Sequence, residues 1–313
     1  MQVNKEDVKI KIVGVGGGGR NAVGRMIEAG ISGVDYVSIN TDDKGYNSSS
    51  SETKIQIGKK ETQGRGAGGN PERGTISANE NQKEIQEVLS DCDMVFITAG
   101  MGGGTGTGAS PVIAKIAKEL GILTVAVVTT PFSFEGKKRM DNAVAGIEEL
   151  KKYADGVVVV PNDNLKKISD VRLTLANAFE IADSVLMQTV KNILDIVRNA
   201  SYINCDFSDI CSVVRDSKSV YTVTGFAEGV DRSKKIVTQI SSNVLLGTSV
   251  EDMDGILIYI IASDNILLEE TDKIIASVLD KASENAFVIH GVNFDESMDD
   301  GMKVVLLATK KRG

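Results

Sequence analysis

Short apolar runs alternate with longer stretches of helical periodicity through the first half of the chain. The apolar runs have the length of buried strands and lie at residues 8–13, 36–40, 94–99, 123–129 and 156–160, and residues 54–57 are predicted to form a short edge-like strand. Apolar residues spaced three and four apart predict helices at about 21–29 and 109–120, and another from residue 137. Residues 44–53, with four consecutive serines, are predicted to form a solvated loop. This alternation predicts an α/β fold with a mainly parallel, Rossmann-like sheet.

A long helix without Gly or Pro is predicted from about residue 174 to 199, with one polar and one apolar face. Asp183 is the exception, because it lies on the flank of the apolar face, four residues after Phe179 and therefore beside it. A carboxylate at a packed face needs a partner. Guanine has two adjacent N–H groups that can donate to one carboxylate, which favours a guanine base stacked on Phe179 and bound by Asp183. An ion pair of Asp183 within the protein is the alternative.

The second half of the chain repeats the strand and helix patterns on a smaller scale. Strands are predicted at 220–226, 256–261, 287–292 and 303–308, and helices at about 232–246 and 267–281. This half contains no glycine-rich stretch of the kind that binds phosphate.

Three glycine-rich stretches lie beside strand ends or helix starts, at 14–19, 64–69 and 102–108. Glycines let the backbone N–H groups approach a ligand closely, and a helix start behind them favours phosphate. The first stretch also fits the G-x-G-x-x-G pattern of dinucleotide-binding enzymes, and no Lys follows the third as in the common phosphate loop. One dinucleotide fold needs one such loop, so three converging loops suit a di- or triphosphate better.

Polar residues follow two of the predicted strands at their carboxyl ends, where open α/β sheets bind ligands. Asn40 and Asp42 end one strand, although a capped turn explains them equally well. Glu135 precedes a helix whose first turn carries Arg139. A basic residue opposes the dipole there, so Arg139 is expected to have an anionic partner, and Glu135 is a candidate for the ribose or phosphate region. An exposed charged turn is the alternative.

An amide and two carboxylates, Asn204, Asp206 and Asp209, follow the long helix. They can cap the next helix. They can also act on a nucleotide, but the roughly fifteen helical residues from Asp183 to Arg198 separate this loop from the base-binding end by about 22 Å. If the nucleotide lies at the upper end, these acids reach its phosphates only from a neighbouring subunit.

The formal net charge of −8 argues against nucleic acid as a partner. No apolar run approaches the about 18 residues of a membrane span, so no direct membrane insertion is expected. Three cysteines without C-x-x-C spacing make a disulfide framework or a zinc site improbable, and no protein-held metal is predicted. A cytoplasmic location is expected.

Together these motifs resemble the FtsZ family, the bacterial tubulin-like cell-division GTPases, over almost the whole chain. The loop at 102–108 is the signature of the tubulin superfamily. The other matching motifs are, in order, 16–19 with Asn21, 40–42, 66–71, 131–136, Phe179 with Asp183, and Asn204-x-Asp206-x-x-Asp209.

The resemblance implies a GTP-binding domain at 1–172, a connecting helix at 173–202, and a smaller α+β C-terminal domain at 203–313 that begins with the catalytic loop. It implies GTP or GDP as ligand and head-to-tail filaments of this chain, in which Asn204, Asp206 and Asp209 complete the GTP site of the next subunit. Hydrolysis would then rest on positioning, on Mg²⁺ at the phosphates and on the acids that orient water. A division role at mid-cell follows from the same resemblance.

The residues expected to contact the nucleotide are Gly17, Gly18, Asn21, Asn40, Asp42, Gly66, Ala67, Gly68, Gly69, Gly102, Gly103, Gly104, Thr105, Gly106, Thr107, Gly108, Glu135, Arg139, Phe179 and Asp183. The chain departs from the family pattern at Arg20, at 210–211, at 217–224 and at 262–264. These departures leave open a paralogue that binds GTP and joins filaments but hydrolyses poorly. An NAD-linked oxidoreductase, which rests on 14–19 alone, is the distant alternative.

Overall fold

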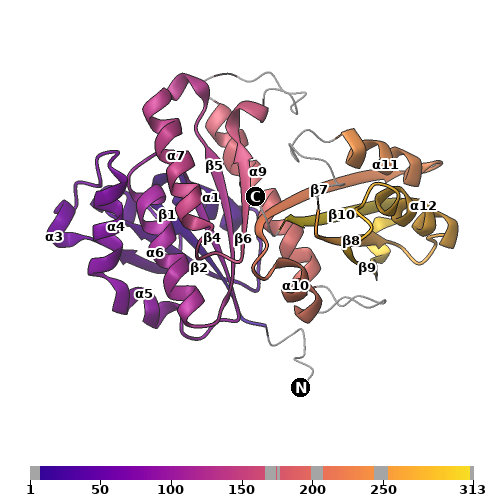
Figure 1. The fold of residues 1–313 in the computed structure, drawn as a ribbon, viewed down its shortest axis with the longest axis horizontal. Coiled ribbons are helices and arrows are strands. Elements are labelled where there is room, and N and C mark those ends of the chain that lie inside the picture. The colour runs from indigo at the N-terminus through magenta and orange to yellow at the C-terminus, as the bar shows by residue number, and fades with distance from the viewer. Residues whose placement is uncertain (1–7, 166–173, 175–176, 199–206, 243–252, 311–313) are drawn as a thin grey trace. The chain divides into compact units, whose positions relative to one another are not determined.

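The computed structural model describes residues 8–165, 174, 177–198, 207–242 and 253–310 (Figure 1). These residues form two compact units, one from Val8 to Lys191 and one from Asn192 onward. The helix α9 (Ala178–Arg198) begins in the first unit and ends in the second.

The sheet of the first unit is parallel throughout and has the order β3-β2-β1-β4-β5-β6. Its strands are β1 (Ile10–Val15), β2 (Asp35–Asn40), β3 (Thr53–Gln56), β4 (Met94–Gly100), β5 (Leu123–Thr130) and β6 (Gly156–Pro161). The strand order reverses between β1 and β4, and ligands bind at such a switch point, outside the carboxyl ends of the strands. The predicted Rossmann-like sheet is confirmed.

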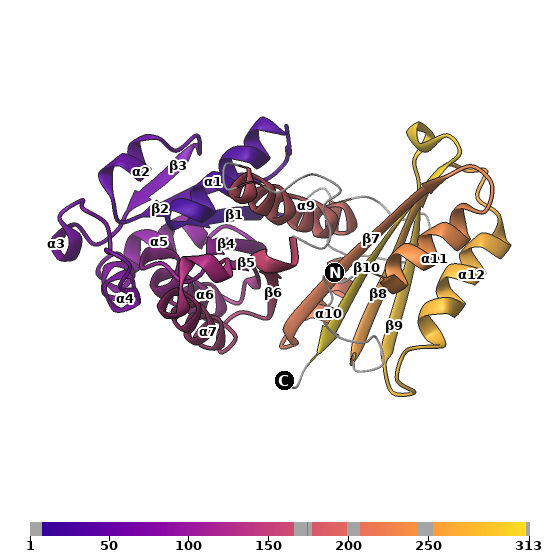
Figure 2. The same cartoon turned by 90° about the horizontal axis from the view of Figure 1, so that it is seen from above.

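Helices cover both faces of this sheet, with α1 and α9 on one side and α6 and α7 on the other (Figure 2). Buried side chains of β1, β4 and β5 pack against Ile113 of α6 and Ile147 of α7. The helices besides α9 are α1 (Gly16–Glu28), α2 (Asp43–Asn47), α3 (Lys59–Thr62), α4 (Pro71–Glu80), α5 (Gln82–Leu89), α6 (Thr105–Glu119) and α7 (Lys137–Leu150).

Two helices begin earlier than predicted, inside the glycine-rich stretches. The helix α1 begins at Gly16 rather than near residue 21, and α6 begins at Thr105 rather than at 109. Close packing explains the first case: a Cβ on Gly19 would lie 2.2 Å from the Thr98 carbonyl oxygen of β4. Glycine there serves the contact between helix and strand, and its low helix propensity does not prevent the helix.

The serine-rich stretch at 44–53 was predicted to be a solvated loop, and that prediction is wrong in part. Its first residues belong to α2, and Ser49 and Ser51 are buried. Ser38 of β2 shares hydroxyl hydrogen bonds of 2.7 Å with both. The buried hydroxyls satisfy one another, which is the condition for placing such polar groups inside a protein.

The second unit holds a mixed sheet with the order β7-β10-β8-β9, in which only β8 and β9 run parallel. The helices α11 and α12 supply apolar side chains to its core, among them Ile236 and Ile274. The elements are α10 (Phe207–Val214), β7 (Lys218–Glu228), α11 (Arg232–Ser242), β8 (Gly255–Ala262), α12 (Leu268–Leu279), β9 (Phe287–Phe294) and β10 (Gly301–Lys310). The predicted α+β C-terminal fold is confirmed, whereas the predicted domain boundaries remain a prediction.

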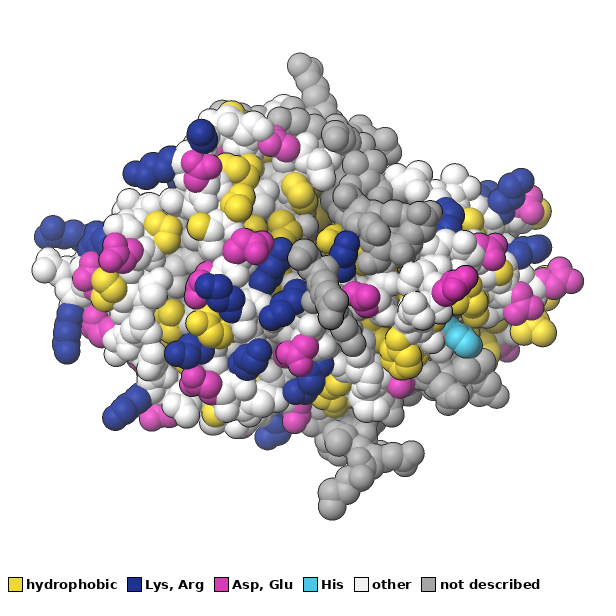
Figure 3. Space-filling view, in the orientation of Figure 1, with side chains coloured by type: hydrophobic (Ala, Val, Ile, Leu, Met, Phe, Trp, Pro, Cys, Tyr) yellow, Lys and Arg dark blue, Asp and Glu magenta, His cyan; other side chains and the backbone are white. Residues whose placement is uncertain are grey.

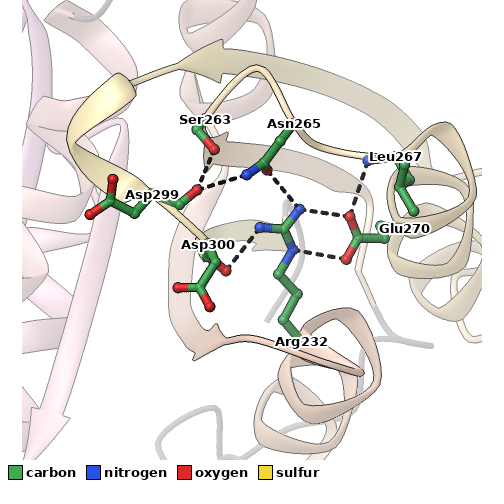
Figure 4. A network of polar contacts seen from close by, with 7 residues as sticks. All are labelled: Arg232, Ser263, Asn265, Leu267, Glu270, Asp299 and Asp300. Carbon is green, nitrogen blue, oxygen red and sulfur yellow. Dashed lines mark hydrogen bonds and ion pairs between the residues drawn. The ribbon is translucent and has the colours of Figure 1, made fainter.

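One buried arginine ties together three connections at the end of this second sheet (Figure 4). Arg232 binds Glu270 through two hydrogen bonds of 2.8 Å and donates to the Asp300 carbonyl oxygen at 2.9 Å. It also donates to Asn265, whose amide in turn binds the Asp299 carbonyl oxygen. The hydrogen bond from Arg232 holds the pKa of Glu270 below its usual value, so this pair stays charged at neutral pH. The network fixes the β7–α11, β8–α12 and β9–β10 connections.

Basic and acidic side chains are interspersed on the face drawn in Figure 3. The one histidine, His290, lies exposed on β9. Among the described helices, none combines the length and the apolar character that a membrane span requires.

Candidate functional site

A cavity of about 360 Å³ opens at the carboxyl ends of β1, β4 and β5 in the first unit. Of the residues predicted to bind a nucleotide, the structure brings Gly17, Gly18, Asn21, Gly103, Gly104, Thr105, Gly106, Glu135, Arg139, Phe179 and Asp183 to its wall. These come from four separate segments of the chain, so the predicted convergence of the first and third glycine-rich stretches with the start of the long helix is present.

Two helix N-termini meet at this cavity. The chain passes directly from β1 into α1 and, after a short turn, from β4 into α6, and a Cβ on Gly16 would lie 3.0 Å from the Gly106 amide nitrogen. No described side chain caps either helix, and neither first turn carries an acid. The N–H groups of two helix starts and their two positive helix ends favour an anion with several oxygens, such as a di- or triphosphate.

The glycines of this region divide into two groups by what surrounds them. A Cβ on Gly17 or Gly103 would meet no described atom within 4 Å, so these two backbones face open cavity. A Cβ on Gly104 would lie 2.7 Å from Ala67, and one on Gly108 would lie 1.9 Å from the Pro71 carbonyl oxygen. The first group lets a ligand approach the backbone, and the second lets α4 and α6 pack closely.

A pair of variants tests this division. Gly103→Ala should keep wild-type stability in urea denaturation but weaken binding of a fluorescent GDP analogue about tenfold or more, because its methyl group occupies ligand space. Gly108→Ala should instead lower the free energy of unfolding by about 1–3 kcal/mol, because Pro71 must move. Unchanged GDP affinity in Gly103→Ala would show that the nucleotide does not approach this backbone.

Three predicted contacts of the loop at 102–108 lie behind the cavity wall. Thr107 is buried, and its hydroxyl accepts a hydrogen bond of 2.8 Å from the Gly102 amide. Gly102 has a φ of +102°, and a side chain there would also collide with Pro131. Gly102, Thr107 and Gly108 are therefore not placed in the cavity, and they hold the shape of the loop.

The predicted contacts at the second glycine-rich stretch and at the end of β2 also lie outside the cavity wall. Asp42 accepts a hydrogen bond of 2.6 Å from the Gly45 amide and caps α2, so the capped-turn alternative is present. The buried Asn40 accepts from the Thr41 amide, and the Thr41 hydroxyl contacts that of Thr105 at 2.7 Å. The residues that line the described cavity do not include Asn40, Asp42, Gly66, Ala67, Gly68 and Gly69.

Phe179 and Asp183 form the other end of the cavity. Phe179 was predicted on the apolar face of α9, yet 46% of it is exposed. Its ring lies nearly perpendicular to those of Phe132 and Phe134, at centroid distances of 5.5 and 6.4 Å. An aromatic ring exposed in a cavity next to a carboxylate matches the predicted stacking place for a base.

Asp183 also has a cationic neighbour, Arg25 of α1, at 3.6 Å between Nε and Oδ2. Burial raises the pKa of Asp183 to about 6, while the charge of Arg25 acts in the opposite direction. The predicted ion pair within the protein is thus present, although 3.6 Å exceeds a normal hydrogen bond. The guanine-binding alternative stays a prediction, and this long contact is compatible with it.

Glu135, in the turn before α7, and Arg139, in the first turn of α7, form an ion pair with each other. Glu135 also accepts a hydrogen bond of 2.9 Å from the Phe132 amide, which closes the turn after β5. The expected anionic partner of Arg139 is therefore Glu135. Arg139 is more than half exposed, so its guanidinium can also reach a ligand oxygen.

Asn162 is a cavity residue that the sequence analysis missed. It follows β6, is buried, and its side-chain oxygen has no hydrogen-bond partner among the described residues. A buried acceptor without a partner indicates a ligand donor or a water. Asn40 was predicted to bind the ligand because it lies at the carboxyl end of a parallel strand. Asn162 lies at such a strand end too, so the same reasoning could have predicted it.

Two of the three predicted catalytic residues, Asn204 and Asp206, lie outside the described residues. Asp209 is half-buried in the first turn of α10, in the second unit. Nothing else in the structure tests its predicted role.

Both halves of the chain match models of known protein families. The Tubulin/FtsZ family GTPase domain matches residues 9–170, and the FtsZ family C-terminal domain matches residues 220–311. A solved FtsZ dimer from M. jannaschii is 40% identical, with a TM-score of 0.88 over 96% of this chain and 88% of that one. CetZ2 from Haloferax volcanii, solved as a GTPγS-bound protofilament, shares the fold at 21% identity, with a TM-score of 0.82 over 97% and 94%. With both domains matched, and with 40% identity over nearly its whole length, the chain belongs to the Tubulin/FtsZ family.

Proposed function

We propose that this chain binds GTP in the cavity of its first unit and hydrolyses it at the junction of two copies in a head-to-tail filament. The N–H groups at the starts of α1 and α6 bind the phosphates, and Arg139 lies within reach of them or of the ribose. The base stacks on Phe179 and donates its two N–H groups to Asp183. The two uncapped helix ends, the open space at Gly17 and Gly103, and the buried carboxylate all fit this ligand.

One observation carries the filament part of the proposal: the cavity has no acid available for hydrolysis. Only two acids line the described cavity. Glu135 is occupied by Arg139 and the Phe132 amide, and Asp183 lies at the base end. Phosphoryl transfer to water needs a group that orients the water, so that group has to come from elsewhere.

A second copy of the chain is the source that fits best. Asp209 comes after the end of α9, and the fifteen residues of continuous helix from Asp183 to Arg198 span about 22 Å. We therefore assign Asn204, Asp206 and Asp209 to the GTP site of the neighbouring subunit. The matched FtsZ structure is a dimer, and the matched CetZ2 structure is a protofilament with GTPγS bound. A head-to-tail contact that does not close yields open filaments.

Mg²⁺ belongs to the proposal as an ion carried by the phosphates. The described residues contain no group of three or more His, Cys, Asp or Glu that could hold a metal. When bound, Mg²⁺ would neutralise charge that develops on the phosphate oxygens during hydrolysis.

The poorly hydrolysing paralogue gains no support from Arg20. Its guanidinium binds the Ser48 hydroxyl and the Asn21 amide oxygen, and it lines a second cavity beside the base end. Arg20 is absent from the wall of the nucleotide cavity. The NAD-linked alternative is set aside by the family assignment, since it rested only on the first glycine-rich stretch.

We further propose that the filament serves cell division, with the protein in the cytoplasm and at mid-cell. This role is proposed from the likeness to FtsZ. The chain also shares its fold with CetZ proteins, so the fold alone does not distinguish a division role from another filament role. The bacterial origin suggested by the sequence stays a prediction.

Concentration dependence tests the shared site. GTP turnover per subunit should rise steeply with protein concentration, in step with the fraction that sediments, because each site needs two copies. ATP in place of GTP is the control and should give neither turnover nor sedimentation. Turnover per subunit that is independent of concentration would contradict the assignment of the acids to a neighbour. Sedimentation with GTP but negligible phosphate release would favour the paralogue.

A further inference from the structure

Asp183 is enclosed by charged groups from every element around it. Arg25 faces it from α1, and Glu180 lies three residues before it on α9. Glu135 and Arg139 line the nucleotide cavity with it, and Arg20 and Glu28 line the second cavity, of about 420 Å³, on its other side. Arg139 pairs with Glu135, and Arg20 is bound to Ser48 and Asn21. Arg25 is the cation that contacts Asp183 directly.

The geometry of Arg25 suits a group that acts on Asp183 mainly by its charge, through a long contact. Its Nε lies 3.6 Å from Asp183, and its Nη2 lies 3.7 Å from Glu180. Both distances exceed that of a normal hydrogen bond, so the Asp183 oxygens keep their lone pairs for a ligand. The Asp183 side chain is only 14% exposed, and a charge 3.6 Å away is weakly screened there.

We propose that Arg25 is a positioning residue for base recognition, which keeps Asp183 ionised and oriented so that it can accept both N–H groups of guanine. This inference rests on the proposed GTP site. Arg25 approaches from the side of the second cavity and does not line the nucleotide cavity. It therefore acts on the base through Asp183 alone.

The pKa of Asp183 lies close enough to neutral pH that the loss of one neighbouring charge changes the ionised fraction of this carboxyl. The pKa of Asp183 lies at about 6 as the net result of three influences: burial raises it, Arg25 lowers it, and Glu180 raises it. A protonated carboxyl carries an O–H donor on one of its oxygens, so it cannot accept a hydrogen bond from each of two adjacent N–H groups as a carboxylate can. Guanine affinity therefore follows the ionised fraction of Asp183. Removal of the Arg25 charge should raise this pKa by about one unit.

The test is the pH profile of GDP affinity between pH 5 and 8.5, at fixed ionic strength. Wild-type affinity should fall as pH decreases through about 6. In Arg25→Gln the midpoint should move up by about one unit, which lowers affinity about fivefold at pH 6, about twofold at pH 7 and not at pH 8.5. Arg25→Lys keeps the charge and should keep the wild-type profile.

Two more variants sharpen the result. Glu180→Gln removes the like charge and should move the midpoint down, in the opposite direction to Arg25→Gln. Lys152→Gln removes an exposed cation that pairs with Glu149 and should leave the profile unchanged. A loss of affinity in Arg25→Gln that is equal at every pH, or an unchanged midpoint, would overturn the inference. Wild-type protein that does not prefer GDP to ADP would contradict the proposed function instead.

Discussion

Asp209→Ala subunits should bind GTP as tightly as wild type and enter filaments, yet hydrolyse GTP about 10²–10⁴-fold more slowly. The expected loss is large because the variant removes a carboxylate that orients the attacking water and leaves the nucleotide cavity of its own subunit intact. Equilibrium GTP binding, sedimentation and phosphate release, measured on the same samples, separate the three effects. Asp272→Ala, which removes an exposed acid on α12, is the matched control.

Complementation decides whether Asp209 acts on the neighbouring subunit. Asp183→Asn subunits should bind GTP too weakly to fill their own cavity but carry intact Asp209, whereas Asp209→Ala subunits carry an intact cavity. Each variant alone should be inactive. A 1:1 mixture should recover about a quarter of wild-type turnover, because one junction in four then joins an intact cavity to an intact acid.

A mixture that stays inactive while both variants sediment together would contradict the shared site. The double variant Asp183→Asn with Asp209→Ala is the control for the mixture. It brings neither half of a site, so it should not restore turnover to either single variant. Recovery with the double variant would mean that the GTP-binding residues have been assigned wrongly.

Much of this architecture follows from local sequence patterns. The strands of both units were predicted within a few residues, because buried strands of parallel and mixed sheets form continuous apolar runs. The position of the cavity was predicted from the glycine-rich stretches and from the tendency of open α/β sheets to bind ligands at the carboxyl ends of their strands. The start of α1 was misplaced because its glycines disfavour a helix locally, while the contact of Gly19 with Thr98 favours it in the fold.

The division of labour within the site could not be predicted from the sequence. Gly103 and Gly108 belong to one motif, but only the position of Pro71, far away along the chain, makes the second a packing residue. Arg25 carries no motif at all. Its proposed role depends on the distance between α1 and α9, and the sequence of neither helix contains a pattern that predicts this distance.

Asp183→Asn should exchange guanine for xanthine specificity. An Asn amide can accept from the N1–H group of xanthine and donate to its C2 carbonyl, but it meets the exocyclic amine of guanine with a second donor. GDP affinity should fall about 10²–10³-fold, since a charge-assisted pair of hydrogen bonds is lost and a donor is left unpaired. XDP affinity should rise by a similar factor. Competition titrations with GDP, XDP and ADP measure the exchange, and equal weakening for all three would show a general disruption of the cavity.

The same variant should be more stable than wild type without nucleotide. The pKa of Asp183 rises from 3.8 to about 6 on folding, so between these values the folded state binds more protons than the unfolded state. Its contribution to stability therefore falls as pH rises through this window and stays low at pH 7. Removal of the ionisable group should add about 1–3 kcal/mol to the free energy of unfolding at pH 7, and much less at pH 4. Urea denaturation at both pH values measures this difference.

A stability gain at neutral pH combined with lost guanine affinity would mean that the buried carboxylate destabilises the protein without nucleotide, and that this cost is compensated only when the ligand binds. An equal effect at both pH values would contradict the raised pKa.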